Sequence, residues 1–349
     1  MLNFPKKLDI QLFLLYSIHV VWYVLVMEEK ENIPFERIAK ECEIIDPSNT
    51  KESITKLANL NTEFPNEHLI LIYNYIFENS NNVEIINYAL QRIDKFKAKE
   101  SRAILIDSLI MKEKLAQRIS DNDALTRIRV NITKALANTK DSQAVYPLLY
   151  CLNSKDENYK VKLSCADALG KIGDKYAVLP LMNVIEDENE SSVYVKESAV
   201  SALGMIGDEK AVDSLITILE SKKGFIDKFT FLKERALEAL NKLNFKGDRV
   251  FNALVKSLRD ESAQVRINAI EVLMNSEDDR AIDLIKGMLD DNNQEVVKNA
   301  VIALYNLLGD EILTEIIDTP TYSQIAREEA INLENDLAEE NEEESYNND

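Results

Sequence analysis

Glycine and proline are scarce in this sequence. Its 349 residues include 8 glycines and 7 prolines. A β-sandwich or a dinucleotide-binding fold of this size needs more glycines in its turns, so the composition disfavours both. Leu, Ile, Ala, Glu and Lys are abundant instead, as is typical of helical proteins. The low content of helix breakers therefore predicts an all-α chain.

Cysteine and histidine are also rare. Cys42, Cys151 and Cys165 form an odd set with no Cys-x-x-Cys pair, which excludes a disulfide framework and a zinc site of the usual kind. His19 and His68 lie far apart in the sequence, so histidine-based metal binding or acid–base catalysis is nearly excluded. We expect no metal, no cofactor and a reducing compartment, the cytoplasm.

Positive charge is outweighed by negative charge. The chain has 41 Lys and Arg against 61 Asp and Glu, a formal net charge of −20. Such a chain repels polyanions, which disfavours nucleic acid and anionic membrane surfaces and favours a basic protein partner. Ten acids and no Lys or Arg lie between Glu328 and Asp349. We expect residues 334–349 to form an acidic, disordered tail.

Residues 10–27 form a long apolar run that follows Lys6 and Lys7. A helix of this length nearly crosses a hydrocarbon layer of about 30 Å. Four interpretations stay open: a membrane anchor, a signal peptide, a helix buried against the first repeats, and a mis-assigned start with Met27 as the true first residue. Residues 1–27 are therefore set apart, and a membrane-anchored location through residues 10–27 is the alternative to the cytoplasm.

The rest of the chain contains an internal repeat. A small residue followed by Leu recurs at intervals of 33, 34, 37, 33 and 31 residues, and a degenerate seventh copy places Leu333 in the same position. We call this the reference position; its first six residues are Ala135, Ala168, Ala202, Ala239, Val272 and Ala303. Apolar residues recur with helical spacing in two stretches of each copy, so each copy predicts two helices. Periods in the thirties without a strand pattern indicate a helical solenoid.

Two stretches show the repeat most clearly, DESAQVRINAIEVL at residues 260–273 and YVKESAVSALGMIGDEKAVDSL at residues 194–215. They resemble the HEAT repeat family, in particular the short HEAT-like repeats named after phycobilisome lyases. The resemblance covers residues 121–333 and implies an α-solenoid, a superhelical stack of six helix pairs plus the degenerate seventh. Residues 28–120 continue with weaker helical patterns, so we expect them to form a divergent helical cap.

Charged residues also recur at fixed places in the repeat. Six residues before the reference position lies a cation, at Arg129, Lys162, Lys196, Lys233 and Arg266. Six residues before the cation lies an acid in several copies, including Asp156 and Asp260. We expect each acid to lie in the turn between the two helices and to pair with its cation as an internal ladder. The alternative is a basic stripe for an anionic ligand, which the acidity of the chain disfavours.

Two motifs suggest chemistry but are better explained by structure, and a third motif is absent. Gly170 to Asp174 has glycines around a lysine, yet these residues follow a helix rather than a strand, unlike a phosphate-binding loop. We expect Gly173 and Gly207 to end helices and the aspartates after them to cap the next ones. Cys151 and Cys165 occupy apolar positions and are predicted to be core residues. Some HEAT-like hydroxylases bind two irons through His-Glu pairs, and this sequence has no His-Glu pair.

The sequence favours a protein-interaction scaffold or adaptor without intrinsic catalysis. Its partner would be a protein of unknown identity, with no nucleic acid and with a membrane only if residues 10–27 are an anchor. An insertion at residues 220–232 lengthens one repeat and offers Phe225, Phe229 and Phe231 as candidate partner anchors, because insertions in repeats often serve binding. Two alternatives are a bilin-lyase-like or other enzyme-associated HEAT subunit and a membrane-tethered assembly factor.

Overall fold

The computed structural model describes residues 44–45, 48–97, 99–187, 190, 192–221, 230–244 and 246–347, with the side chains of 340–347 excepted. These residues form an all-α solenoid with eighteen α-helices, α3 to α20, and contain no strand. None of the described helices combines the length and the apolar character that a bilayer crossing requires. The apolar segment 10–27 lies outside the described residues.

The chain divides into two compact units, of which unit 1 ends at Ile172 and unit 2 begins at Gly173. In unit 1, α5 packs on α4 and α8, and α10 packs on both α8 and α9. Its helices are α3 (Thr50–Glu63), α4 (Asn66–Asn79), α5 (Val83–Phe96), η1 (Lys99–Ser101), α6 (Arg102–Ile110), α7 (Lys112–Arg118), α8 (Asn122–Thr139), η2 (Ser142–Ala144), α9 (Val145–Asn153) and α10 (Tyr159–Ile172).

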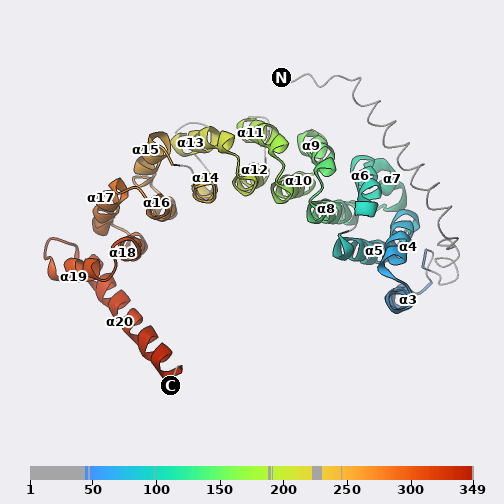
Figure 1. Cartoon of the computed structure of the whole chain (residues 1–349). Helices are drawn as coiled ribbons and strands as arrows, with labels where there is room; N and C mark the ends of the chain where they lie inside the picture. Colours follow the sequence, from blue (N-terminus) through green and yellow to red (C-terminus); the bar gives the residue numbers. More distant parts are fainter. Residues whose placement is uncertain are drawn as a thin grey trace. The chain divides into compact units, whose positions relative to one another are not determined.

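Unit 2 contains the later helix pairs of the repeat. Its helices are η3 (Lys175–Ala177), α11 (Val178–Glu186), α12 (Val193–Ile206), η4 (Glu209–Ala211), α13 (Val212–Glu220), α14 (Thr230–Leu243), α15 (Asp248–Ser257), α16 (Ala263–Asn275), α17 (Arg280–Gly287), η6 (Met288–Asp290), α18 (Gln294–Leu308), α19 (Glu311–Asp318) and α20 (Gln324–Asn347). Within this unit the first helices α11, α13, α15 and α17 lie in one layer and the second helices α12, α14, α16 and α18 in another (Figure 1).

A capped 3-10 turn introduces the first helix in several repeats. The side chains of Asp174 and Asp208 accept hydrogen bonds from the amides of Tyr176 and Lys210, both at 2.9 Å. This satisfies amides that have no partner inside the helix. Gly173 and Gly207, immediately before these aspartates, have φ angles of 77° and 74°, a conformation that glycine adopts at little cost. The glycines and aspartates are therefore joints between helices, as the sequence predicts.

The second helices stack closely because small residues lie between them. A Cβ atom built on Gly204 of α12 would lie 2.9 Å from both the Cα and the Cβ atoms of Ala239 in α14. This is shorter than van der Waals contact, so only glycine fits there without movement. The residues at the reference position, from Ala135 to Ala303, are all buried. At Ala239 the repeated small residue is thus the contact point between α12 and α14.

The C-terminal end differs from the expected disordered tail. Residues 334–347 continue α20, which begins at Gln324 and ends at Asn347. Glu, Ala and Leu are strong helix formers, and the first part of α20 is anchored by Ala326 and Ala330, both fully buried. The acidic residues therefore extend an established helix.

Candidate partner-binding surface and the joints that support it

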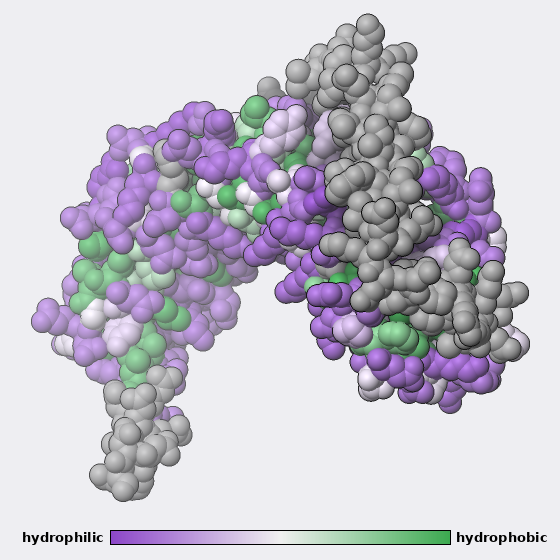
Figure 2. Space-filling model, turned by 45° about the vertical axis from the view of Figure 1, so that its right-hand side comes forward, coloured by the Kyte–Doolittle hydropathy of each residue, from purple (hydrophilic) through white to green (hydrophobic). Residues whose placement is uncertain are grey.

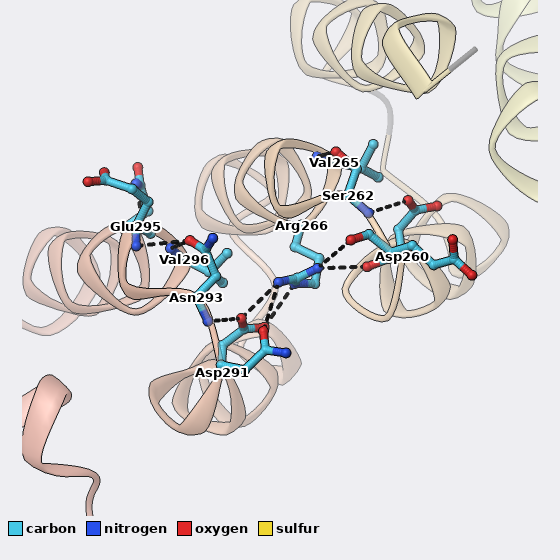
Figure 3. Close-up of polar contacts among 11 residues, drawn as sticks. Asp260, Ser262, Val265, Arg266, Asp291, Asn293, Glu295 and Val296 are labelled. Carbon is cyan, nitrogen blue, oxygen red and sulfur yellow. Dashed lines mark hydrogen bonds and ion pairs between the residues drawn. The ribbon is translucent and has the colours of Figure 1, made fainter. Parts of the chain in front are cut away.

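The joint around Arg266 shows how neighbouring repeats are connected (Figure 3). Arg266 donates from Nε and Nη2 to the two carboxylate oxygens of Asp291, both at 2.8 Å. Its Nη1 also donates to the backbone carbonyl of Asp260 at 2.8 Å. Asp291 in turn accepts from the amide of Asn293, whose side chain caps α18. One guanidinium thus ties a second helix to its own turn and to the turn of the next repeat.

Arg129 forms a similar joint in unit 1. Its Nη1 and Nη2 atoms lie 2.5 and 2.7 Å from the two carboxylate oxygens of Glu157, and both side chains are 5% exposed. Nη2 also donates to the carbonyl of Leu109 at 2.8 Å. The ion pair is bidentate and almost fully removed from water, so each charge depends on the other.

The ladder residues pair in a different register from the one expected. Lys233 contacts the carboxylate of Asp260 at 2.7 Å, and that acid lies 27 residues after it, in the following turn. Lys196 donates to the carbonyl of Ile185 in the last turn of α11 at 2.9 Å and to that of Asp187 just after this helix at 2.8 Å, both within its own repeat. The carboxylate partner of Arg129, Lys233 and Arg266 therefore comes from the next repeat, because α8, α14 and α16 each lie against the turn of the repeat that follows. In the turn before α10, Glu157, whose side chain is 5% exposed, makes this contact, and its exposed neighbour Asp156 does not.

The remaining cation of the predicted ladder, Lys162, lies on α10 at the equivalent position. Of the three candidate anchors, Phe225 and Phe229 lie outside the described residues. Phe231 lies at the start of α14 and is partly buried. A role for these aromatic side chains in binding a partner stays a prediction.

The exposed side of α12, α14 and α16 carries a network of carboxylates around Arg235. Arg235 donates from Nε to Glu197 at 2.9 Å and from Nη1 to the two oxygens of Glu238 at 2.9 and 2.7 Å. Glu234 lies beside them, and burial together with the negative charges of Glu238 and Glu197 raises its pKa, against the opposing effect of Arg235. One cation therefore faces three carboxylates.

Amide side chains continue this network toward α16. Asn241 donates to Glu271 at 3.0 Å, and Asn275 donates to Asn241 at 3.0 Å. An open depression of about 190 Å³ lies beside them. We call this surface the second-helix face; its residues are Glu197, Glu234, Arg235, Glu238, Asn241, Lys242, Asn268, Glu271 and Asn275. It offers carboxylates and amide groups in rows along neighbouring helices, a pattern that suits the cations and backbone groups of a protein segment.

The two described cysteines lie in the core, as the sequence predicts. Cys151 in α9 is 2% exposed and Cys165 in α10 is 0% exposed. A hydrogen bond with Cys165 lowers the pKa of the Cys151 thiol, while burial raises the pKa of Cys165 well above its ordinary value. Both thiols are enclosed by packed side chains, so neither is presented to a substrate.

The fold and these joints define a class, the α-solenoids built from stacked helix pairs. Within that class, the family model for HEAT repeats matches residues 112–193, 147–230, 227–306 and 251–333. These windows span most of the chain, and the chain belongs to the HEAT repeat family, which confirms the family resemblance. No curated protein matches the chain.

Several solved structures resemble this chain at low sequence identity. Human deoxyhypusine hydroxylase is 18% identical with a TM-score of 0.34, covering 76% of this chain and 94% of its own. The CpcE–CpcF complex of the phycocyanin lyase from Nostoc sp. is 20% identical with a TM-score of 0.40, covering 68% and 94%. Kap121p is 11% identical with a TM-score of 0.52, covering 87% of this chain and 38% of its own. The likeness to Kap121p supports the solenoid fold and carries nothing about activity.

Proposed function

We propose that the chain is a protein-interaction scaffold that holds a partner on the second-helix face of unit 2. The HEAT-repeat fold is compatible with such a role. The observation that carries the proposal is the network in which Arg235 faces Glu197, Glu234 and Glu238. Negative charge exceeds positive charge there. Burial is the main cause that raises the pKa of Glu234, and the negative charges of Glu238 and Glu197 add to it; a cation from a partner would offset that repulsion.

The partner segment that fits this face is basic and has free backbone groups. Lysine or arginine side chains would pair with Glu238 and Glu271, which are exposed or partly exposed. Asn241 and Asn275 have amide groups that can both donate and accept, as backbone recognition requires. Figure 2 shows a mostly hydrophilic surface on the side of the molecule in view, and the residues named for the second-helix face are all polar or charged. Recognition would therefore be mainly electrostatic, with fast association that weakens in salt.

Affinity purification from the cells that make the protein tests this role. The wild-type chain is used as bait beside a variant with Glu238→Lys and Glu271→Lys, which reverses charge on the second-helix face. The matched control carries Asp213→Lys and Asp283→Lys on the exposed side of the first helices α13 and α17. We expect the wild type and the control to retain the same protein partner and the second-helix variant to lose it.

Two outcomes contradict the proposal. Recovery of no protein with the wild-type chain under gentle conditions removes the scaffold role. Equal recovery with the second-helix variant and the wild type removes this surface as its site. Circular dichroism of each bait shows whether the variants keep the helical fold, so that a loss of partner is not caused by unfolding.

The same purified samples and the cells that make the protein also test the two alternative functions. A chromophore that co-purifies with the chain would favour an enzyme-associated subunit of the bilin-lyase-like kind. Cell fractionation addresses location, for which we propose the cytoplasm, where thiols such as Cys151 and Cys165 stay reduced. Recovery in the membrane fraction after a high-salt wash would favour an anchor through residues 10–27 and a membrane-tethered assembly factor.

A further inference from the structure

The last described helix pair leaves one side of the stack open. In α8 the residue two positions before the reference position packs against the following second helix, α10, and we call the equivalent place in every second helix the packing position. The Thr133 hydroxyl, for example, lies 2.5 Å from the Ser164 hydroxyl of the following second helix. The packing residues of six repeats are no more than 1% exposed, namely Thr133, Ala166, Val200, Leu237, Ile270 and Val301. The seventh, Ile331 in α20, is 42% exposed.

The cation of the same helix, Arg327, also has a polar atom without a hydrogen-bond partner in the described part of the chain. Arg327 lies in α20 at the place that Arg266 holds in α16 and Lys233 holds in α14. Those two cations reach a carboxylate of the following turn at 2.8 and 2.7 Å. The Nε atom of Arg327 is buried and has no hydrogen-bond partner within the described residues. A buried donor without an acceptor is unfavourable, so an arriving carboxylate would be favoured.

A third group on α20 matches the stacking pattern. Glu197 lies five residues before its reference position and accepts from Arg235, which lies four residues before the reference position of the next helix. Glu328 lies at the place in α20 that corresponds to Glu197 and is exposed. Exposed hydrophobic residues also gather on the surface beside the grey C-terminal segment (Figure 2). We call Arg327, Glu328 and Ile331 the end face.

We propose that the end face is a second docking site, separate from the second-helix face, which takes a helix pair of another protein as a further repeat. The occupant has three features: a carboxylate in the turn between its helices for Arg327, an apolar or small residue against Ile331, and a Lys or Arg against Glu328. Each feature copies a contact that already exists between described repeats, so the site continues an interface of the chain itself.

The chain supplies a matched probe for this site. Residues 276–308 contain α17, α18 and Asp291, the carboxylate that receives Arg266. A synthetic peptide of this sequence with Asn299→Arg also has a cation at the place of Arg235. Its control is the same peptide with Asp291→Asn. Fluorescence-anisotropy titration of each labelled peptide with the full chain measures docking.

We expect the probe to bind the wild-type chain and to lose about tenfold in affinity with Arg327→Ala, with Ile331→Asp, and with the Asp291→Asn peptide. A chain with Glu271→Lys is the control on the second-helix face and should bind the probe as the wild type does. Binding that none of the end-face changes weakens would overturn the proposal.

A fusion protein tests the same site without requiring the isolated peptide to fold. In this variant residues 337–349 are replaced by a second copy of residues 276–308 carrying Asn299→Arg, which keeps the spacing from the reference position to the next turn. We expect its thermal unfolding midpoint to rise, and Arg327→Ala to cancel that rise. Failure of both the titration and the fusion contradicts the proposal. So does self-association of the wild-type chain in sedimentation that Arg327→Ala abolishes, because the occupant would then be a second copy.

Discussion

At the scale of single residues, the backbone at the end of each second helix is a recurring constraint. Five residues after the reference position the φ angle is positive in five repeats, and the two glycines among these residues adopt it without strain. The residues at this cap position are Lys140 at 50°, Gly173 at 77°, Gly207 at 74°, Asn244 at 44° and Glu277 at 54°. The glycines could be predicted from the sequence, whereas a lysine carries no such signal.

Lys140→Gly should therefore stabilise the chain. Replacing a non-glycine residue that has a left-handed backbone removes strain of about 1–2 kcal/mol. Glycine also gives the unfolded chain more conformational freedom, which offsets about 0.4–1 kcal/mol of this gain. We expect a net gain of about 0.5–1 kcal/mol in urea unfolding. Lys134, exposed within the same helix α8, is the control, because Lys134→Gly should cost about 1 kcal/mol. A loss of stability with Lys140→Gly would contradict the strain argument.

A second prediction at this scale concerns the buried ion pair between Arg129 and Glu157. Glu157→Gln leaves the guanidinium of Arg129, which is 4% exposed, without its counter-charge. We expect a loss of about 3 kcal/mol in the free energy of unfolding, since breaking one side of a buried pair costs about 3–5 kcal/mol. Asp156→Asn, one residue away and exposed, should change stability by less than about 0.5 kcal/mol. Similar effects of the two changes would show that the pair is not a structural joint.

The sequence suggested Asp156 for a definite reason. Asp260, for example, lies six residues before its own cation, Arg266, and 27 residues after the preceding cation, Lys233, which it contacts. Spacing in a single sequence cannot tell which of the two the acid meets. It also cannot tell which of two adjacent acids turns inward, because the backbone direction of the turn decides that. The cations were predictable, and their partners were not.

At the scale of elements, the approach of α12 to α14 sets the packing of unit 2. Gly204→Ala would place a methyl group against Ala239, so the helices must separate. Overpacking costs about 1–3 kcal/mol and exceeds the helix-propensity gain of alanine, which is up to about 1 kcal/mol. We expect a net loss of about 1–2 kcal/mol by urea unfolding.

Gly287 provides the matched comparison for this prediction. It also lies in a helix, α17, and a Cβ atom there would meet nothing within 4 Å. Gly287→Ala should therefore leave stability unchanged or raise it slightly. An equal loss at both glycines would mean that the α12–α14 contact is not the cause.

At the scale of the whole molecule, the repeat, the solenoid and the family were all predictable from the sequence. Residues of the same kind recur together at several fixed positions of each repeat. The second-helix face could not be predicted, since Glu197, Glu234 and Glu238 become neighbours of Arg235 only when α12 packs on α14. Phe225 and Phe229 carried the sequence-based proposal for a partner site, and they lie outside the described residues. The proposed surface therefore rests on charge brought together by stacking.

The central claim is that a protein partner binds the second-helix face. Carboxylate footprinting of the chain, alone and with the partner that it captures, tests this claim most directly. A carbodiimide couples exposed carboxylates to glycine ethyl ester, and mass spectrometry then measures modification at each residue. The account predicts that the partner protects Glu238 and Glu271 and leaves Asp213 and Asp283 on the first helices unchanged. Protection of the first-helix carboxylates, with Glu238 and Glu271 still modified as in the free chain, would contradict it.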